Sequence, residues 1–403
     1  MTERARLSIC VPSRNRQDTF RQTIRDLIAN PRPDVEFVLA DNSDDPSVMN
    51  AFMAAIADPR IRYLPAPSET LPMQDNWERT MEATSGDWIV FIGDDDYVDP
   101  DVSDVIQEIA RRQPATEVIG WNRPSFKWPS YRPFSGNLNF SLLNDVRRVD
   151  RAAMIQRMFL WEGASYVPAS PFTVYHGAVS RAAMDNLKRR YSGRYFEHPT
   201  VDFDCGGKLL FSAMNFVFVN RPLSILGATE KSNSAAVGRY ARAMEIYDTF
   251  IREKGNRFES GGAMDDFPFK SFLGVAGSIM SAQHWFKQRY NIRIDGWEEN
   301  FVRAMATDCS RAIDRSEFEL QVELCRRAIA AFAGGKYLPA FAPRFTGTHA
   351  GMFTGLNGTV LYVDERIGDC QTPAELYRIL QSLTAPVSEL KYEFGDARLV
   401  DAA

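Results

Sequence analysis

Apolar residues in the first part of the chain form short continuous runs that alternate with stretches of helical spacing. The runs cover residues 7–11, 35–40, 61–64, 88–92 and 118–121. Runs of this length are typical of buried strands. Between them, apolar residues recur every three or four positions, as at Phe20, Ile24 and Leu27, which predicts helices. Strands and helices that alternate in this way predict βαβ units with right-handed connections and a mostly parallel sheet.

Polar clusters follow three of the expected strands. They are Pro12, Ser13, Arg14 and Asn15 after the first strand, Asp41 and Asn42 after the second, and Asp94, Asp95 and Asp96 after the fourth. In an open parallel sheet, ligands bind beyond the carboxyl ends of the strands. We therefore expect the three clusters to border one crevice.

The acidic triplet at 94–96 is the most informative of these clusters. Three adjacent carboxylates repel one another unless a positive charge lies among them, and a divalent cation prefers such oxygen ligands. The alternative is a solvated acidic turn that caps the following helix, which is common for an isolated triplet. The coincidence of three polar strand ends favours the cation site.

The rest of the chain divides into an irregular part and a helical part. Residues 122–196 are rich in aromatics and prolines and predict one clear helix, at 151–160. Asp202 and Asp204 precede an expected helix, and a strand follows at 216–219. Beyond residue 235, helices are expected at 239–253, 270–290, 297–313, 317–332 and 373–383. We therefore predict a first domain at 1–235, with halves at 1–121 and 122–235, and a mainly helical region at 236–403.

Composition narrows the class of protein. The formal net charge of -5 gives no electrostatic basis for nucleic-acid binding. The 5 cysteines are scattered without a C-x-x-C pair, which suits a reducing compartment. No signal peptide is visible, and the longest uncharged apolar stretch, 271–281, is about half the length of a membrane span. These features predict a cytoplasmic protein, with peripheral contact at the inner face of the membrane as an alternative.

Four motifs occur in the order of the strand–helix alternation. They are V-P-S-R-N-R at 11–16, A-D-N-S at 40–43, Asn76 with S-G-D-W-I at 85–89, and F-I-G-D-D-D-Y at 91–97. Together they resemble a family 2 glycosyltransferase with the GT-A fold over about residues 5–235. The resemblance implies an α/β fold with a mostly parallel twisted sheet flanked by helices. It also implies inverting transfer of a sugar from a nucleotide-diphosphate sugar, a UDP-sugar being favoured, to a hydroxyl acceptor in polysaccharide or glycoconjugate synthesis.

The resemblance also implies a role for each motif residue. Asp95 is the first choice as ligand for Mn²⁺ or Mg²⁺ on the diphosphate, and Asp96 is the second, since the triplet fits both D-x-D and D-D-x. Asp202 would be the catalytic base, with Asp204 as a second candidate. The nucleotide-sugar would contact Pro12, Ser13, Arg14, Asn15, Asp41, Asn42, Asn76 and Asp94. The four histidines are dispersed, and we expect structural or surface roles for them.

The chain departs from the family pattern at two places. Thr70 stands where some members have an arginine, and residues 227–232 lack the histidine of an R-x-H-x-x-S stretch. Lys231 or Arg16 would then contact phosphate. The alternative is a catalytically degenerate GT-A domain that binds nucleotide or serves in assembly. A nucleotidyltransferase ranks last, because 12–16 contains no glycine.

The sequence leaves the acceptor open between a glycan, a lipid-linked and a small-molecule hydroxyl compound. It also leaves the role of the helical region open between three possibilities. The region would cover the acceptor side, form a homo-oligomer or rest on a membrane surface.

Overall fold

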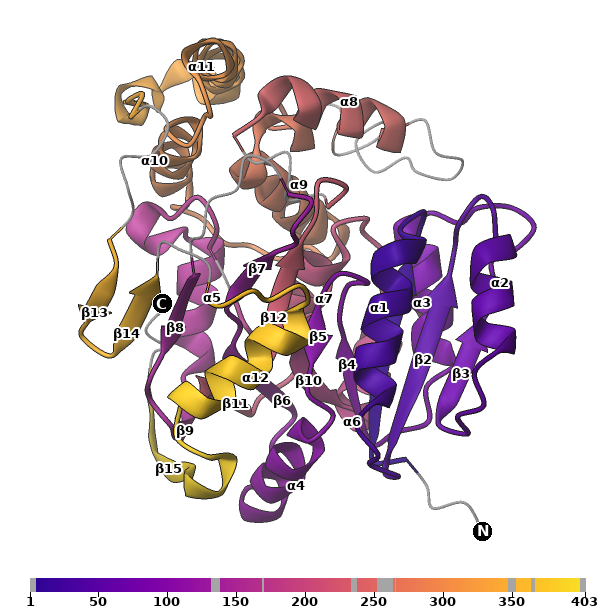
Figure 1. Cartoon of the computed structure of the whole chain (residues 1–403). Helices are drawn as coiled ribbons and strands as arrows, with labels where there is room; N and C mark the ends of the chain where they lie inside the picture. Colours follow the sequence, from indigo (N-terminus) through magenta and orange to yellow (C-terminus); the bar gives the residue numbers. More distant parts are fainter. Residues whose placement is uncertain are drawn as a thin grey trace.

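A nine-stranded, mostly parallel sheet forms the centre of the computed structural model (Figure 1). The described residues are 5–131, 138–168, 170–232, 238–251, 264, 266–346, 353–363 and 367–398. In spatial order the strands are β15 (Lys391–Arg398), β9 (Asp145–Val149), β11 (Phe216–Pro222), β6 (Val118–Asn122), β10 (Gly177–Ser180), β4 (Trp88–Phe91), β1 (Leu7–Ser13), β2 (Val35–Asp41) and β3 (Ile61–Leu64). The predicted α/β fold class is confirmed.

The register of the central strands brings their carboxyl ends to one edge. Ser13 pairs with Asp41 between the parallel strands β1 and β2, and Cys10 pairs with Phe91 between β1 and β4. The backbone N–H of Ile92 continues this ladder by donating to the carbonyl of Cys10 at 3.0 Å. The three polar strand ends predicted from the sequence are therefore neighbours.

Helices cover both faces of the sheet because both faces are apolar. Leu7, Ile9 and Val11 of β1 point into one buried cluster, and Cys10 points into another. The first cluster is covered by α1 (Gln17–Ile28), α4 (Val102–Arg112) and α12 (Pro373–Leu383), and the second by α3 (Met73–Glu82), α6 (Arg181–Arg190) and α7 (Val201–Ser212). Two further helices are α2 (Ser47–Ala54) and α5 (Arg151–Phe159). Continuous apolar runs, rather than alternating ones, are what a sheet buried on both faces requires.

The part at 122–196, expected to be irregular with one helix, contains more strands than predicted. Besides β9 and β10 in the main sheet, it holds β7 (Ser125–Lys127), which pairs with β12 (Ser224–Ala228), and β8 (Leu138–Ser141), which pairs with β14 (Val360–Val363). Strands β5 (Tyr97–Val98) and β13 (Gly355–Asn357) complete the two small sheets. These segments have three to five residues, and β9 carries two arginines, so their pairing is set by neighbouring strands rather than by an apolar run.

The C-terminal part is helical, as predicted, and then returns to the sheet. Helices α8 (Tyr240–Ile251), α9 (Val275–Arg289), α10 (Glu298–Cys309) and α11 (Arg315–Ala331) surround a third buried cluster, at the top of Figure 1. Strand β15 then pairs in parallel with β9, and α12 packs against β5 and β12. The domain boundary at residue 235 stays a prediction. Because α12 and β15 pack onto the sheet, the first buried cluster also includes residues from the C-terminal end of the described chain. Among the described residues, none of the helices has the length and apolar character needed to cross a bilayer.

Candidate active site

The acidic triplet at the end of β4 is buried. Asp94 is 0 %, Asp95 4 % and Asp96 1 % exposed. The chain turns sharply here, with the N–H of Asp96 donating to the carbonyl of Gly93 at 3.2 Å. The triplet is buried, so the alternative of a solvated acidic turn is wrong. Burying three carboxylates without compensation is unfavourable. The surrounding residues must supply that compensation.

Asp96 is held entirely by protein groups. Its Oδ2 accepts hydrogen bonds from the N–H of Gly93 at 2.6 Å and the hydroxyl of Tyr175 at 2.8 Å, and lies 2.8 Å from Nε2 of His176. Its Oδ1 accepts from the N–H of Gly227 at 2.6 Å. Burial opposes ionisation of Asp96, but His176 and the other donors outweigh it, so the pKa of Asp96 lies below its usual value. Asp96 thus anchors the turn that presents its two neighbours.

Asp94 and Asp95 share one guanidinium. Nε of Arg16 lies 3.0 Å from Oδ1 of Asp94, and Nη1 of Arg16 lies 3.1 Å from Oδ2 of Asp95. Ser13 and Ser232 donate further hydrogen bonds to Asp94 and Asp95, respectively. Burial raises the pKa of Asp94 against the attraction of Arg16. Burial, reinforced by the neighbouring carboxylates and opposed by Arg16, raises the pKa of Asp95 to about 7.

When ionised, the three carboxylates carry more negative charge than the one guanidinium of Arg16 neutralises. Within the described part of the chain, no group of three or more His, Cys, Asp and Glu side chains could hold a metal ion unaided. The contacts of Asp95 with Arg16 and Ser232 are both made by its Oδ2. One carboxylate oxygen beside uncompensated charge fits a divalent cation whose remaining ligands come from a diphosphate and water. The residues present therefore fit the metal that the resemblance implies.

Asp41 lies at the neighbouring strand end with one oxygen unsatisfied. The residue is 0 % exposed, and its Oδ1 accepts hydrogen bonds from the N–H and the hydroxyl of Ser43 at 3.0 and 2.6 Å. Its Oδ2 is buried and has no hydrogen-bond partner among the described residues. An orphaned buried acceptor is unfavourable and requires an explanation, such as an unseen donor. A ligand N–H group would satisfy this oxygen.

The other predicted donor-site residues organise the loops around Asp41. Asn42 holds the loop before α3 through two hydrogen bonds with the backbone of Leu71, at 2.8 and 2.9 Å. Asn76 accepts from Nε of Arg79 at 2.8 Å, and Arg79 in turn donates to the carbonyl of Asp41. Arg79 was not predicted from the sequence, although its i,i+3 spacing from Asn76 on α3 is a usable signal.

The loop after β1 is shaped by Asn15, which has a positive φ of 57°. Its side chain exchanges hydrogen bonds with Asp44, donating to a carboxylate oxygen at 2.8 Å and accepting from the backbone N–H at 3.0 Å. Arg14 lies 4.0 Å from the same carboxylate, at the surface. Pro12 is buried at the end of β1, where it pairs with Ala40. This geometry turns Arg16 inward to the triplet and leaves Arg14 outside.

The two candidate bases differ in their surroundings. Asp202, the second residue of α7, is half-buried, and its carboxylate forms no ion pair with a described residue. Asp204 is buried and its Oδ2 accepts from two backbone N–H groups and from Lys208, at 2.8, 3.1 and 3.0 Å. Burial raises the pKa of both carboxyls. Of the two, only Asp204 is paired with a buried cation, Lys208.

A four-residue segment joins the triplet to the base helix. Thr173 donates to the carbonyl of Asp202 at 3.2 Å, while Tyr175 and His176 hold Asp96. His176 is buried with a positive φ of 55°, and Ser224 lies 2.8 Å from its other ring nitrogen. The structural role of His176 agrees with expectation. Its link to the triplet was missed because no spacing in the sequence indicates it. His284 stacks on Phe267, with ring centroids 3.7 Å apart, and His349 lies outside the described residues.

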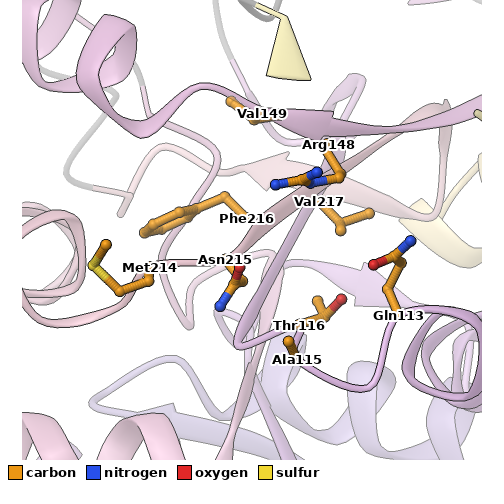
Figure 2. Close-up of a pocket in the computed structure, with 9 residues that line it drawn as sticks. All are labelled: Gln113, Ala115, Thr116, Arg148, Val149, Met214, Asn215, Phe216 and Val217. Carbon is orange, nitrogen blue, oxygen red and sulfur yellow. The ribbon is translucent and has the colours of Figure 1, made fainter. Parts of the chain in front are cut away.

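A shallow pocket at the opposite ends of β6 and β11 is not this site (Figure 2). It is lined by Gln113, Ala115, Thr116, Arg148, Val149, Met214, Asn215, Phe216 and Val217. None of the predicted site residues lines it, and Arg148 is its one charged side chain. Ligands of such sheets bind at the carboxyl ends of the strands, where the triplet lies.

The sheet order and its acidic strand end agree with the GT-A-like α/β fold expected from the sequence. Residues 8–164 match the model of Glycosyl transferase family 2, so this part of the chain is a family 2 glycosyltransferase domain. The predicted family and enzyme class are thereby confirmed. No curated protein matches the chain significantly.

Solved structures give only a distant likeness. Residues 1–349 of S. aureus TarS have 12 % sequence identity and a TM-score of 0.40, over 83 % of this chain and 89 % of that one. The same fragment in complex with UDP-GlcNAc gives 12 % identity and a TM-score of 0.41 with the same coverage. Full-length TarS gives 11 % and 0.38, and 54 % of it is covered. The roles proposed below rest on the geometry of this chain.

Proposed function

We propose that the protein transfers a sugar from a nucleotide-diphosphate sugar to a hydroxyl acceptor, with inversion at the sugar carbon. The observation that carries this proposal is the buried triplet at 94–96, with the orphaned oxygen of Asp41 at the neighbouring strand end and with Asp202 linked to the triplet through residues 173–176. A divalent cation bound with the diphosphate would supply the missing positive charge, and the nucleobase would supply the missing N–H donor. A nucleotide-diphosphate sugar with its cation would satisfy both features.

The donor would bind along the ends of β1, β2 and β4. Asp41 Oδ2 would accept the N–H of a uracil-like base, which favours a UDP-sugar. Pro12 and Ser13 would border the base and ribose with Asn42 and Asn76, while Arg14 and Asn15 shape the outer loop. Arg16 offers a fixed guanidinium for phosphate and also neutralises Asp94. A planar, permanently charged fork suits both partners.

Asp95 would hold Mn²⁺ or Mg²⁺ together with the diphosphate. A bound divalent cation supplies Lewis-acid neutralisation of a departing nucleotide diphosphate. Asp96, the second predicted ligand, is less favoured because protein donors occupy both of its oxygens. Asp94 would instead fix Arg16 and face the ribose side.

Asp202 would take the proton from the acceptor hydroxyl. Inverting transfer requires a base on the side opposite the leaving group. Burial raises the pKa of Asp202, which makes the carboxylate a better proton acceptor near neutral pH. Asp204 remains the second candidate, although its pairing with Lys208 favours a structural role. The acceptor itself stays open between a glycan, a lipid-linked and a small-molecule hydroxyl compound.

A screen followed by two substitutions tests this proposal. Thermal shifts with UDP-, GDP- and dTDP-sugars, with and without Mn²⁺, identify the donor, because a ligand raises the melting temperature by mass action. Asp202→Asn should lower nucleotide release by at least about 100-fold while donor binding persists. Asp95→Asn should abolish the Mn²⁺-dependent part of the shift. Asp18→Asn, at an exposed helical position, is the control.

The outcomes separate enzyme from binding module. A donor-induced shift without nucleotide release by the wild type, for any donor or acceptor offered, would favour the degenerate alternative. No shift and no release would contradict both.

A further inference from the structure

A buried cluster of charged side chains lies behind the proposed base. Lys208, in the middle of α7, is 0 % exposed, and its Nζ lies 2.9 Å from Oε2 of Glu197 and 3.0 Å from Oδ2 of Asp204. The hydroxyl of Tyr290 donates to the same oxygen of Glu197. Breaking a buried ion pair by removing one partner is strongly unfavourable, so these groups hold one another in place.

The cluster fixes the segment that leads into α7. Four successive backbone N–H groups donate to two carboxylates: those of Tyr195 and Phe196 to Glu78 of α3, and those of Glu197 and His198 to Asp204 of α7. The N–H of Thr200, the residue before α7, donates to Nδ1 of His198 at 3.1 Å. With each amide bound, residues 195–200 have one conformation, and that conformation sets where Asp202 lies.

The end of α9 closes the cluster from the helical region. Tyr290 follows the last residue of α9, and its ring packs against Tyr191 with centroids 4.7 Å apart. The ring of Trp285 lies 5.4 Å from that of His198. Figure 1 shows α9 beside α7, beneath the other C-terminal helices. The helical region thus reaches the segment that precedes the proposed base.

We propose that Lys208, Glu197 and Tyr290 form a positioning unit that fixes the first turn of α7 and, with it, the carboxylate of Asp202. This inference rests on the proposed function, in which Asp202 is the base. Proton transfer requires the base within hydrogen-bond reach of the acceptor hydroxyl, so displacement of the turn lowers kcat. The donor binds at β1, β2 and β4, so its KM does not depend on the unit.

Kinetics of the full chain test the unit. Lys208→Met should lower kcat for nucleotide release from UDP-sugars by at least about tenfold, with the donor KM changed by less than about twofold. Tyr290→Phe should lower kcat in the same direction by less. Tyr337→Phe, a half-buried tyrosine elsewhere in the helical region, is the control and should leave both constants unchanged. If the three residues act as one unit, the effects of their substitutions on kcat do not add. The double variant Lys208→Met/Glu197→Gln should therefore have a kcat no lower than that of Lys208→Met alone.

Amide hydrogen exchange gives a second readout that needs no activity. Both single variants should speed exchange at 195–204 and leave β1 and α1 as protected as in the wild type. If Lys208→Met does not fold, Tyr290→Phe decides, since it removes one hydroxyl. Folded variants with unchanged kcat, or with unchanged exchange at 195–204, would overturn the inference. A wild type that releases nucleotide from no donor would contradict the proposed function, whereas exchange would still decide the positioning.

Discussion

At the scale of single residues, Gly227 lies where the 227–232 stretch packs against the triplet. Its N–H donates to Asp96, and a Cβ at this position would lie 1.7 Å from the carbonyl oxygen of Asp95. Backbone atoms cannot make that room cheaply, so no larger residue fits between the 227–232 stretch and the triplet. The glycine therefore lets the stretch approach close enough for Ser232 to reach Asp95.

Gly227→Ala should therefore destabilise the protein, by about 2 kcal/mol or more, through this clash. Gly207→Ala is the matched control: it lies inside α7, where a Cβ would meet only the ring of Phe159 at an ordinary 3.6 Å. That substitution should be neutral or stabilising by up to about 1 kcal/mol, because alanine favours a helix. Chemical denaturation of both variants measures the change in unfolding free energy that each substitution causes. Equal stability of the two would show that the loop is not packed against the triplet.

Candidate site residues could be predicted from the sequence where they lie next to an expected strand, and not where the fold alone brings them together. Asp41 and the triplet were predicted because each comes at the end of an expected strand. Tyr175 and His176, which hold Asp96, come 79 and 80 residues later in the chain and are joined to it only by the fold. Arg79 was missed for a different reason: its i,i+3 spacing from Asn76 is visible in the sequence, but its contact with the carbonyl of Asp41 is not.

At the scale of elements, the start of α9 depends on a buried carboxylate from α10. Asp308 is 3 % exposed and accepts from the N–H of Ala276 at 3.1 Å, which satisfies one of the amides left open at a helix start. Burial raises the pKa of Asp308 to about 6, against the pull of that N–H group. The folded state therefore binds a proton more tightly than the unfolded state does.

This shift predicts a pH dependence with a definite sign. As pH rises from about 4 to about 6, the contribution of Asp308 to stability should fall by about 3 kcal/mol and then stay constant. Asp308→Asn, which keeps an acceptor without the charge, should gain on the wild type over that window. The control is Asp314→Asn at the exposed start of α11, where hydrogen bonds lower the pKa of the aspartate and the sign is opposite. Unfolding free energies at several pH values test it, and parallel curves for the wild type and Asp308→Asn would contradict it.

Elements with continuous apolar runs or clear helical spacing were predictable, and short paired segments were not. The runs at 7–11, 35–40 and 61–64 correspond to β1, β2 and β3, and the last expected helix coincides with α12. Strand β10 has only four residues, and its place between β4 and β6 comes from antiparallel pairing on both sides. Such pairing depends on residues far apart in sequence, which periodicity cannot report.

At the scale of the whole molecule, the two ends of the described chain share one core. Leu376, Tyr377 and Leu380 of α12 are buried in the same cluster as β1, and the N–H of Arg221 Nε donates to the carbonyl of Ala385 at 2.8 Å. Gln381 donates to Asp99 beyond the triplet at 2.9 Å. In the order of the chain, helices α8 to α11 therefore lie between the sheet domain and the C-terminal segment, α12 and β15, that completes the packing of the sheet.

A truncation tests this arrangement. A chain that ends at residue 363 keeps α8 to α11 but loses α12 and β15, which uncovers one face of the sheet and leaves β9 as an edge. Burial of each large apolar side chain is worth about 1.5–3 kcal/mol, so losing several removes much of the 5–15 kcal/mol that stabilises a typical domain. We expect aggregation or loss of cooperative unfolding, while a chain that ends at residue 398 behaves as the full chain does. A soluble 1–363 protein that unfolds cooperatively at the wild-type temperature would show instead that the sheet domain is complete without its C-terminal segment.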